Sequence, residues 1–180
     1  MDNEALKHRA RSRFERGRAV DALWASMLLW PVLALAVWAA PVVDTALWAV
    51  GVTWLAAWGA LWRGGELAAG VMPGVMCAIF PLVGAHCASH IGHMCTGDGC
   101  YSLCAPLCGV GGLVAGLVLA RRMIKIGGRW TGWLTGGFIV LAMGATGCTC
   151  IGLGGVAGVT LGLALGATPL IWVQPSRTTS

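Results

Sequence analysis

The sequence predicts an all-α membrane protein with about six transmembrane helices arranged as three hairpins. Of its 180 residues, 57% are hydrophobic and only 11% are charged, and the mean hydropathy is +0.77. Soluble domains carry about 25% charged residues, so this chain has too few to cover a surface in water. The composition therefore excludes an ordinary soluble enzyme, a disordered protein and a soluble nucleic-acid-binding domain.

Six apolar runs are each long enough to cross a hydrocarbon core, which takes about 20 helical residues. They cover 22–40, 45–62, 67–85, 103–120, 130–147 and 151–173. We expect a turn at Gly147–Cys148–Thr149–Cys150, because 130–173 is too long for one span. The runs form one transmembrane domain over 22–173, between a basic segment at 1–21 and a tail at 174–180.

The basic residues predict the orientation of these helices. Six of the twelve Lys and Arg lie in the first twenty residues and four lie at 121–129, while Arg63 and Arg177 stand alone. Six crossings place all twelve on one side of the membrane and place Asp44 and Asp98 on the other, as the positive-inside rule requires. We therefore expect a multi-pass protein of the bacterial inner (cytoplasmic) membrane with both termini in the cytoplasm.

The basic segment at 1–21 has two alternative interpretations. A cleaved signal peptide would have a shorter apolar run than 22–40, without its three tryptophans and Pro31. RNA binding would also use basic residues, but we expect a topology signal that contacts anionic lipid headgroups. The sequence therefore predicts the lipid bilayer as a partner and no nucleic acid.

Tryptophan is concentrated in the first predicted hairpin, where seven of the ten tryptophans lie between 22 and 62. Tryptophan is enriched at membrane interfaces, where Trp24, Trp38 and Trp62 are expected. The deeper Trp30, Trp54 and Trp58 are expected to face lipid or a neighbouring helix, with packing on a pigment or quinone as the alternative.

Glycine recurs at four-residue intervals in the second and third hairpins. This spacing makes a flat groove on one helix face, where a partner helix can approach closely. The residues expected in such contacts are Gly112, Gly116, Gly132, Gly136, Gly154, Gly158, Gly162 and Gly166. The pattern predicts tight packing, and it leaves open whether the partner helix belongs to the same chain, to a second copy or to another membrane subunit.

Residues 112–144 resemble a bacterial two-helix membrane domain of unknown function. The likeness rests on a Gly-rich helix, the basic loop Ala120–Lys125, the pair Gly127-Gly128 and a second Gly-rich helix. It implies a cytoplasmic loop between two spans and no activity. Gly147-Cys148-Thr149 is similar to the Gly-Cys-Thr element of sulfur-compound transporters, although Cys150-Ile151-Gly152 follows where that family commonly has a polar Gly-His-type continuation.

The loop at 86–102, expected outside the cytoplasm, is rich in cysteine and histidine. His86, His90 and His93 would share one face if the preceding helix continues, although Gly92 favours a break there. Cys100, Cys104 and Cys108 would share a face if the next helix begins early. A turn at 96–99 would bring the two faces together. Imidazole and thiolate ligands favour Zn²⁺ or Cu(I), and the ligands expected are His86, His90, His93, Cys95, Cys100 and Cys104.

Disulfide bonds are the competing interpretation of the same cysteines, because thiols pair in an oxidising compartment. The candidates are Cys87, Cys95, Cys100, Cys104, Cys148 and Cys150, with Cys108 slightly deeper. Cys95 and Cys100 flank the turn and are the easiest pair, while Cys77 is expected to be a buried thiol. A third alternative is thiol redox or persulfide chemistry.

The sequence favours a non-enzymatic membrane component, because it contains no phosphate-binding Gly-x-x-x-x-Gly-Lys loop, no Cys-x-x-Cys-His and no charge at the centre of an apolar run. We expect a tightly packed subunit of a homo- or hetero-oligomeric complex with a disulfide-stapled outer face. The alternative is a protein or transporter that handles Zn²⁺, copper or a sulfur compound through the loop at 86–102.

Overall fold

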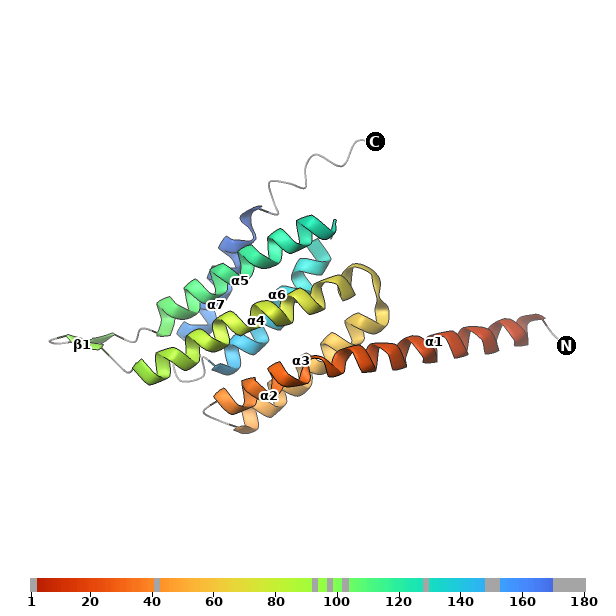
Figure 1. The fold of residues 1–180 in the computed structure, drawn as a ribbon, viewed down its shortest axis with the longest axis horizontal. Coiled ribbons are helices and arrows are strands. Elements are labelled where there is room, and N and C mark those ends of the chain that lie inside the picture. Colours follow the sequence, from red (N-terminus) through yellow and green to blue (C-terminus); the bar gives the residue numbers. More distant parts are fainter. Residues whose placement is uncertain are drawn as a thin grey trace.

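The computed structural model describes residues 3–40, 43–91, 94–96, 99–101, 104–127, 130–147 and 153–169. The described chain is almost entirely α-helical and includes one short antiparallel β-hairpin (Figure 1). The elements are α1 (Asn3–Met27), α2 (Trp30–Ala39), α3 (Val43–Arg63), α4 (Gly65–Ile91), β1 (Met94–Thr96), β2 (Gly99–Tyr101), α5 (Cys104–Ile126), α6 (Trp130–Gly147) and α7 (Leu153–Gly166). The predicted helical class is therefore confirmed.

Three helices within the described ranges are long and apolar enough to cross a membrane. They are Val43–Arg63, Gly65–Gly84 and Pro106–Ile126, and the bent pair of α1 and α2 is a fourth candidate if it is counted as one span. The apolar stretch Gly154–Gly166 in α7 is shorter. The described chain thus has three or four candidate spans, compatible with a multi-pass membrane protein, and the predicted number of six is not confirmed.

The first predicted span is divided into two helices. α1 runs without interruption from the basic residues into the apolar ones and ends at Met27, and α2 follows at an angle of 46°. Pro31 explains the break, because it has no N–H to donate and its ring clashes with a carbonyl one turn earlier. At the other end of α2, Ala40 is extended (φ −80°, ψ 136°), as expected for a residue before Pro41.

Glycine residues in the left-handed conformation form two of the helix ends. Gly64 and Gly65, with φ of +73° and +63°, connect α3 to α4, and Gly127, with φ of +68°, follows α5. A residue with a Cβ rarely adopts this conformation, which is why glycine commonly ends helices.

The chain runs back and forth along the bundle, with α4 beside α6 and α5 beside α7. α6 runs parallel to α4: Thr131 at its start contacts Glu66, and Gly144 near its end lies against Pro81. α5 runs antiparallel to α4, since Gly111 near its start also lies against Pro81. Figure 1 shows the β-hairpin at the opposite end of the bundle from the start of α4.

The buried core lies mainly among α4, α5 and α6. Its largest fully buried side chains include Leu82 of α4, Leu119 and Met123 of α5, and Ile139 and Met143 of α6. In α3 only 22% of the candidate span is buried, compared with 44% in each of the candidate spans of α4 and α5. α3 is therefore at the edge of the bundle, and α4 and α5 are at its centre.

Candidate functional site

The contact between α4 and α6 is made through backbone atoms at four glycines. A Cβ added to Gly74 would lie 2.6 Å from Cα of Gly136, and one added to Gly132 would lie 2.8 Å from the carbonyl oxygen of Glu66. A Cβ added to Gly70 would come closer still to the carbonyl oxygen of Gly132. Carbon atoms ordinarily approach to 3.5–4.0 Å, so these positions have no space for any side chain.

A second contact of the same kind joins α5 to α7. A Cβ on Gly112 would lie 2.5 Å from the carbonyl oxygen of Val159, and one on Gly116 would lie 2.7 Å from that of Leu163. From the other side, a Cβ on Gly166 would lie 2.7 Å from Cα of Gly116, and one on Gly162 would meet the α5 backbone. These partner helices belong to the same chain.

The predicted packing residues differ in how closely they approach the neighbouring helix. Gly112, Gly116, Gly132, Gly136, Gly162 and Gly166 lie in the two contacts described above. The Gly158 carbonyl would be 3.7 Å from a Cβ on Gly109, an ordinary van der Waals distance, and Gly154 is exposed. Sequence reasoning missed Gly70 and Gly74, although their four-residue spacing is the signal that identifies the others.

The turn between α3 and α4 is held by an arginine from α1. The Nη2 atom of Arg18 donates hydrogen bonds to the carbonyl oxygens of Trp62 (2.7 Å) and Arg63 (2.8 Å). The last carbonyls of a helix have no partner within the helix, and a cation there also interacts favourably with the helix dipole. Arg18 therefore joins α1 to the end of α3, and its guanidinium lies 6.0 Å from the centre of the Phe14 ring.

Several basic residues gather at this same end of the bundle. Across the starts of α4 and α6, the Thr131 hydroxyl donates to the Glu66 carboxylate at 2.5 Å. The last turns of α5 reach the same level, because a Cβ on Gly132 would lie 3.0 Å from the sulfur of Met123. Arg18, Arg63, Arg121, Arg122 and Lys125 are thus at the end of the helical bundle where α4 and α6 begin, opposite the end that leads into the β-hairpin.

The Cys/His-rich loop at 86–102 begins in the last turns of α4 and continues through the β-hairpin that precedes α5. His86 and His90 are four residues apart in the last turns of α4, which extends six residues beyond the predicted end at 85. His93 lies outside the described residues. The predicted helix break near Gly92 agrees with the end of α4 at Ile91.

The prediction that Cys100 shares one face of the next helix with Cys104 and Cys108 is wrong for Cys100. Cys100 lies on β2, and α5 begins only at Cys104, so Cys100 cannot share a helix face with Cys104 and Cys108. The cause is the hairpin, whose pairing places Cys95 opposite Cys100 and keeps the chain extended up to Tyr101.

Two cysteines have described side chains, and they differ in oxidation state. Cys108 is fully buried and disulfide-bonded, whereas Cys77 is a buried free thiol. The predicted disulfide set left Cys108 out because of its greater depth. Cys148 and Cys150 lie outside the described residues. The backbone of Cys87 belongs to α4, and its side chain is not among those described.

The structure describes no metal site among the side chains that it places: no three His, Cys, Asp or Glu residues are grouped closely enough to hold an ion. The ligands predicted from the sequence have their side chains outside this described set. The metal and disulfide interpretations of the loop therefore both remain predictions.

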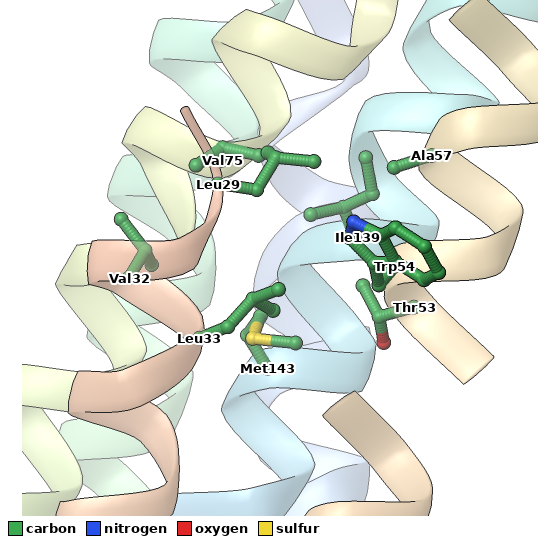
Figure 2. A pocket seen from close by; sticks show the side chains of 9 residues that line it. All are labelled: Leu29, Val32, Leu33, Thr53, Trp54, Ala57, Val75, Ile139 and Met143. Carbon is green, nitrogen blue, oxygen red and sulfur yellow. The ribbon is translucent and has the colours of Figure 1, made fainter. Parts of the chain in front are cut away.

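A small apolar cavity lies where α2, α3, α4 and α6 meet (Figure 2). Its volume of about 10 Å³ has room for about one water molecule, and such a site would need polar partners to hold one. Its lining residues are Leu29, Val32, Leu33, Thr53, Trp54, Ala57, Val75, Ile139 and Met143. The Thr53 hydroxyl donates to the carbonyl of Ala49, and the indole N–H of Trp54, which also belongs to the lining, is buried without a hydrogen-bond partner among the described residues.

A larger apolar groove of about 580 Å³ lies between α2 and α3. It is lined by Trp30, Leu33, Ala34, Val37, Trp38, Leu47, Val50, Gly51 and Trp54. Nearer the end of α3, Trp58 stacks on Trp62 with ring centroids 5.7 Å apart, and the Trp58 indole N–H donates to the carbonyl of Ala19. Trp54 and Trp58 thus contact neighbouring helices, and Trp30 remains 54% exposed.

Comparison of the chain with protein-family models, with curated proteins and with solved structures finds no match.

Proposed function

We propose that the chain is a non-enzymatic, multi-pass component of the bacterial inner membrane, which acts as a rigid packing unit within a homo- or hetero-oligomeric complex. The observation that carries this proposal is the pair of backbone contacts at the α4/α6 and α5/α7 interfaces. Helices in contact through glycine backbones gain dispersion interactions that lipid chains supply less well. The central bundle is therefore packed by its own residues, and its outer surface is left for lipid or other subunits.

Six membrane passes remain our proposal, supported by the parallel helix pairs. α6 lies beside α4 from Glu66 to Pro81, so it covers most of the depth of the candidate span Gly65–Gly84. α7 likewise lies beside α5, itself a candidate span. Because α6 and α7 lie at the same depth as the candidate spans of α4 and α5, we expect them to lie in the bilayer as well.

The orientation that we propose has both termini in the cytoplasm. It is supported by the basic residues that gather where α3 and α5 end, because Lys and Arg favour the cytoplasmic side. Reporter fusions after Ser180 and within the loop at Asp98 should report opposite compartments. If both report the same compartment, the six-pass arrangement is wrong.

The surface that we propose for neighbouring subunits is the outer face of α3. Trp48 is 78% exposed and Leu55 is 56% exposed, in the candidate span with the least burial. Exposed apolar surface of this kind contacts either lipid or another protein. Two substitutions on α3 and two on α7 distinguish these alternatives.

The test of assembly uses gentle detergent extracts from the native membrane, separated by native gel electrophoresis. Trp48→Ala/Leu55→Ala should shift the protein from an assembly to the monomer. Leu161→Ala/Leu165→Ala is the matched control, because these α7 side chains are 65% and 62% exposed. A monomer already present in the wild type, or loss of the assembly in both variants, would contradict the role of α3.

A disulfide-stapled outer face is part of the same proposal. It is supported by the register that sets Cys95 opposite Cys100 and by the disulfide of Cys108. Residues directly opposite in an antiparallel pair have Cβ atoms about 4.5–5.5 Å apart, so Cys95 and Cys100 would approach by about 1 Å to reach the roughly 3.5–4.5 Å that a disulfide spans. Disulfides would also hold the ends of α4 and α5 together.

Metal or sulfur-compound handling is the second candidate function. It is favoured by the placement of His86 and His90 four residues apart on α4, immediately before the hairpin that carries Cys95 and Cys100. Metal analysis together with a free-thiol count separates the two. Stoichiometric zinc or copper that is lost in a His86/His90/His93→Ala variant supports the second candidate, and metal-free protein with oxidised outer cysteines supports the first.

A further inference from the structure

α1 has two faces with different surroundings. Arg18, Ala22 and Ser26 lie on the face toward the bundle: Arg18 bonds to the end of α3, Ala22 is 5% exposed and Ser26 is fully buried. Figure 1 shows the N-terminal half of α1 extending away from the other helices. The rest of its surface is therefore available to the surroundings.

A single stripe of exposed residues runs along the opposite face. At 3.6 residues per turn, the stripe falls within a sector of about 100°. Its members are Arg9, Arg13, Arg16, Val20, Leu23, Trp24 and Met27, all of them exposed. The stripe is wholly basic up to Arg16 and wholly apolar from Val20 onward, so its chemistry changes within one helical turn.

The three arginines of the stripe differ from the other basic residues of α1 in their contacts. Arg11 is ion-paired to Glu15 at 3.2 Å, and Arg18 is bonded to the α3 carbonyls. Arg9, Arg13 and Arg16 make no hydrogen bond or ion pair with any residue that the structure describes. Their positive charge is thus available for an external anion.

We propose that Arg13 and Arg16, with Arg9 beyond them, form a binding site for the headgroup of an anionic phospholipid. This inference rests on the proposed location of the chain in a membrane. The apolar part of the stripe would contact acyl chains, and the change at 16–20 would mark the boundary of the hydrocarbon core. Exposed arginines directly beyond that boundary lie where lipid phosphates are found, and their guanidinium groups bind phosphate oxygens in a bidentate manner.

The spacing along the helix agrees with the thickness of the headgroup layer. At 1.5 Å per residue, Arg16 lies about 6 Å beyond Val20, Arg13 about 10 Å and Arg9 about 16 Å. The headgroup region adds about 5–7 Å on each side of the hydrocarbon core. Arg16 is within that layer, and the long side chain of Arg13 can reach it, while Arg9 is the outermost of the three.

The test is a titration of the full-length protein with phosphatidylglycerol, read by native mass spectrometry in detergent and repeated in nanodiscs of equimolar phosphatidylcholine and phosphatidylglycerol. One basic residue near an anionic surface changes binding roughly fivefold, so Arg13→Gln/Arg16→Gln should weaken phosphatidylglycerol binding roughly 25-fold. Phosphatidylcholine binding should stay the same. High salt should weaken the wild-type preference, and inorganic phosphate at matched ionic strength should not displace the lipid.

The matched control is Lys7→Gln/Arg11→Gln, which removes the same charge from the opposite face of the same helix. It should change phosphatidylglycerol binding by less than about threefold, and Arg13→Lys/Arg16→Lys should keep most of the affinity because the charge remains. Equal losses in the two Gln variants would overturn the proposal, because they would show an effect of net charge alone.

Two further outcomes would overturn the inference in distinguishable ways. A wild-type protein that cannot be reconstituted into nanodiscs contradicts the membrane location as well as the lipid site. A protein that is reconstituted without preferring phosphatidylglycerol contradicts the lipid site alone. If a short fluorescent RNA binds the wild type in phosphatidylcholine nanodiscs and fails to bind the Arg13→Gln/Arg16→Gln variant, the arginines bind nucleic acid and the lipid proposal is wrong.

Discussion

Replacing Gly74 by alanine measures how much the α4/α6 contact stabilises the bundle. The added Cβ would lie 2.6 Å from Cα and 2.8 Å from the carbonyl oxygen of Gly136. Ordinary carbon contacts begin near 3.5 Å, so the two helices must separate by about 1 Å. Overpacking of this kind costs about 1–3 kcal/mol, and separation would also weaken the contacts made by Gly70 and Gly132.

Replacing a glycine by alanine also stabilises the helix itself, and comparison with a control variant cancels this contribution. Alanine stabilises the interior of a helix by about 0.5–1 kcal/mol relative to glycine, because glycine loses more conformational entropy on folding. Gly59→Ala in α3 shares this gain, and a Cβ there would have no atom within 4 Å. The difference between the two variants therefore isolates the steric cost, which we expect to be about 1–3 kcal/mol.

The assay is thermal unfolding of each variant in the same detergent, followed by circular dichroism. For a chain of this length, 1 kcal/mol changes Tm by roughly 2–4 °C, so Gly74→Ala should melt roughly 2–12 °C below Gly59→Ala. Gly74→Ala should also unfold at a lower concentration of a denaturing detergent than Gly59→Ala. If Gly74→Ala is as stable as Gly59→Ala in both experiments, the backbone contact between α4 and α6 is not part of the folded protein.

Three other substitutions or modifications test separate parts of the structure. Gly162→Leu should lower thermal stability, or abolish folding, because even a Cβ there would meet the α5 backbone, and Gly59→Leu, where a Cβ would have no atom within 4 Å, should have a smaller effect; equal melting of both variants would contradict this difference. Arg18→Gln removes both hydrogen bonds to the carbonyls that end α3 and should cost about 1 kcal/mol, and an unchanged Tm would contradict their contribution to stability. Cys77, which is 1% exposed, should react with a maleimide only after denaturation, and modification of the folded protein would show that its thiol is accessible.

The predictions that agree with the structure depend on local properties of the chain. The long apolar runs imply helices, because the backbone in a bilayer must satisfy its own hydrogen bonds. The gap between the predicted runs 45–62 and 67–85 contains Gly64-Gly65, where α3 ends and α4 begins, whereas the break beside Pro31 fell inside the single predicted run 22–40. Turn residues likewise indicated the reversal between Cys95 and Cys100, which the structure forms as a hairpin.

The length of a helix is less well predicted than its presence. α4 continues beyond 85 to Ile91 and passes through two internal prolines, and α5 begins only at Cys104. The hairpin between them sets both limits, because residues paired in strands cannot also belong to a helix. The expected stripe of Cys100, Cys104 and Cys108 depended on an early start of α5, and therefore it was wrong.

The sequence by itself determined that the chain is helical and apolar and that several helices carry flat glycine faces. Only the tertiary structure decided which faces meet: α4 with α6 and α5 with α7, none of them the two helices of one predicted hairpin. A four-residue spacing defines a face without defining its partner, since every glycine face accepts any other at close range. The same reason applies to Arg18, which is one of six basic residues near the N-terminus in the sequence and becomes distinct only because α1 lies against the end of α3.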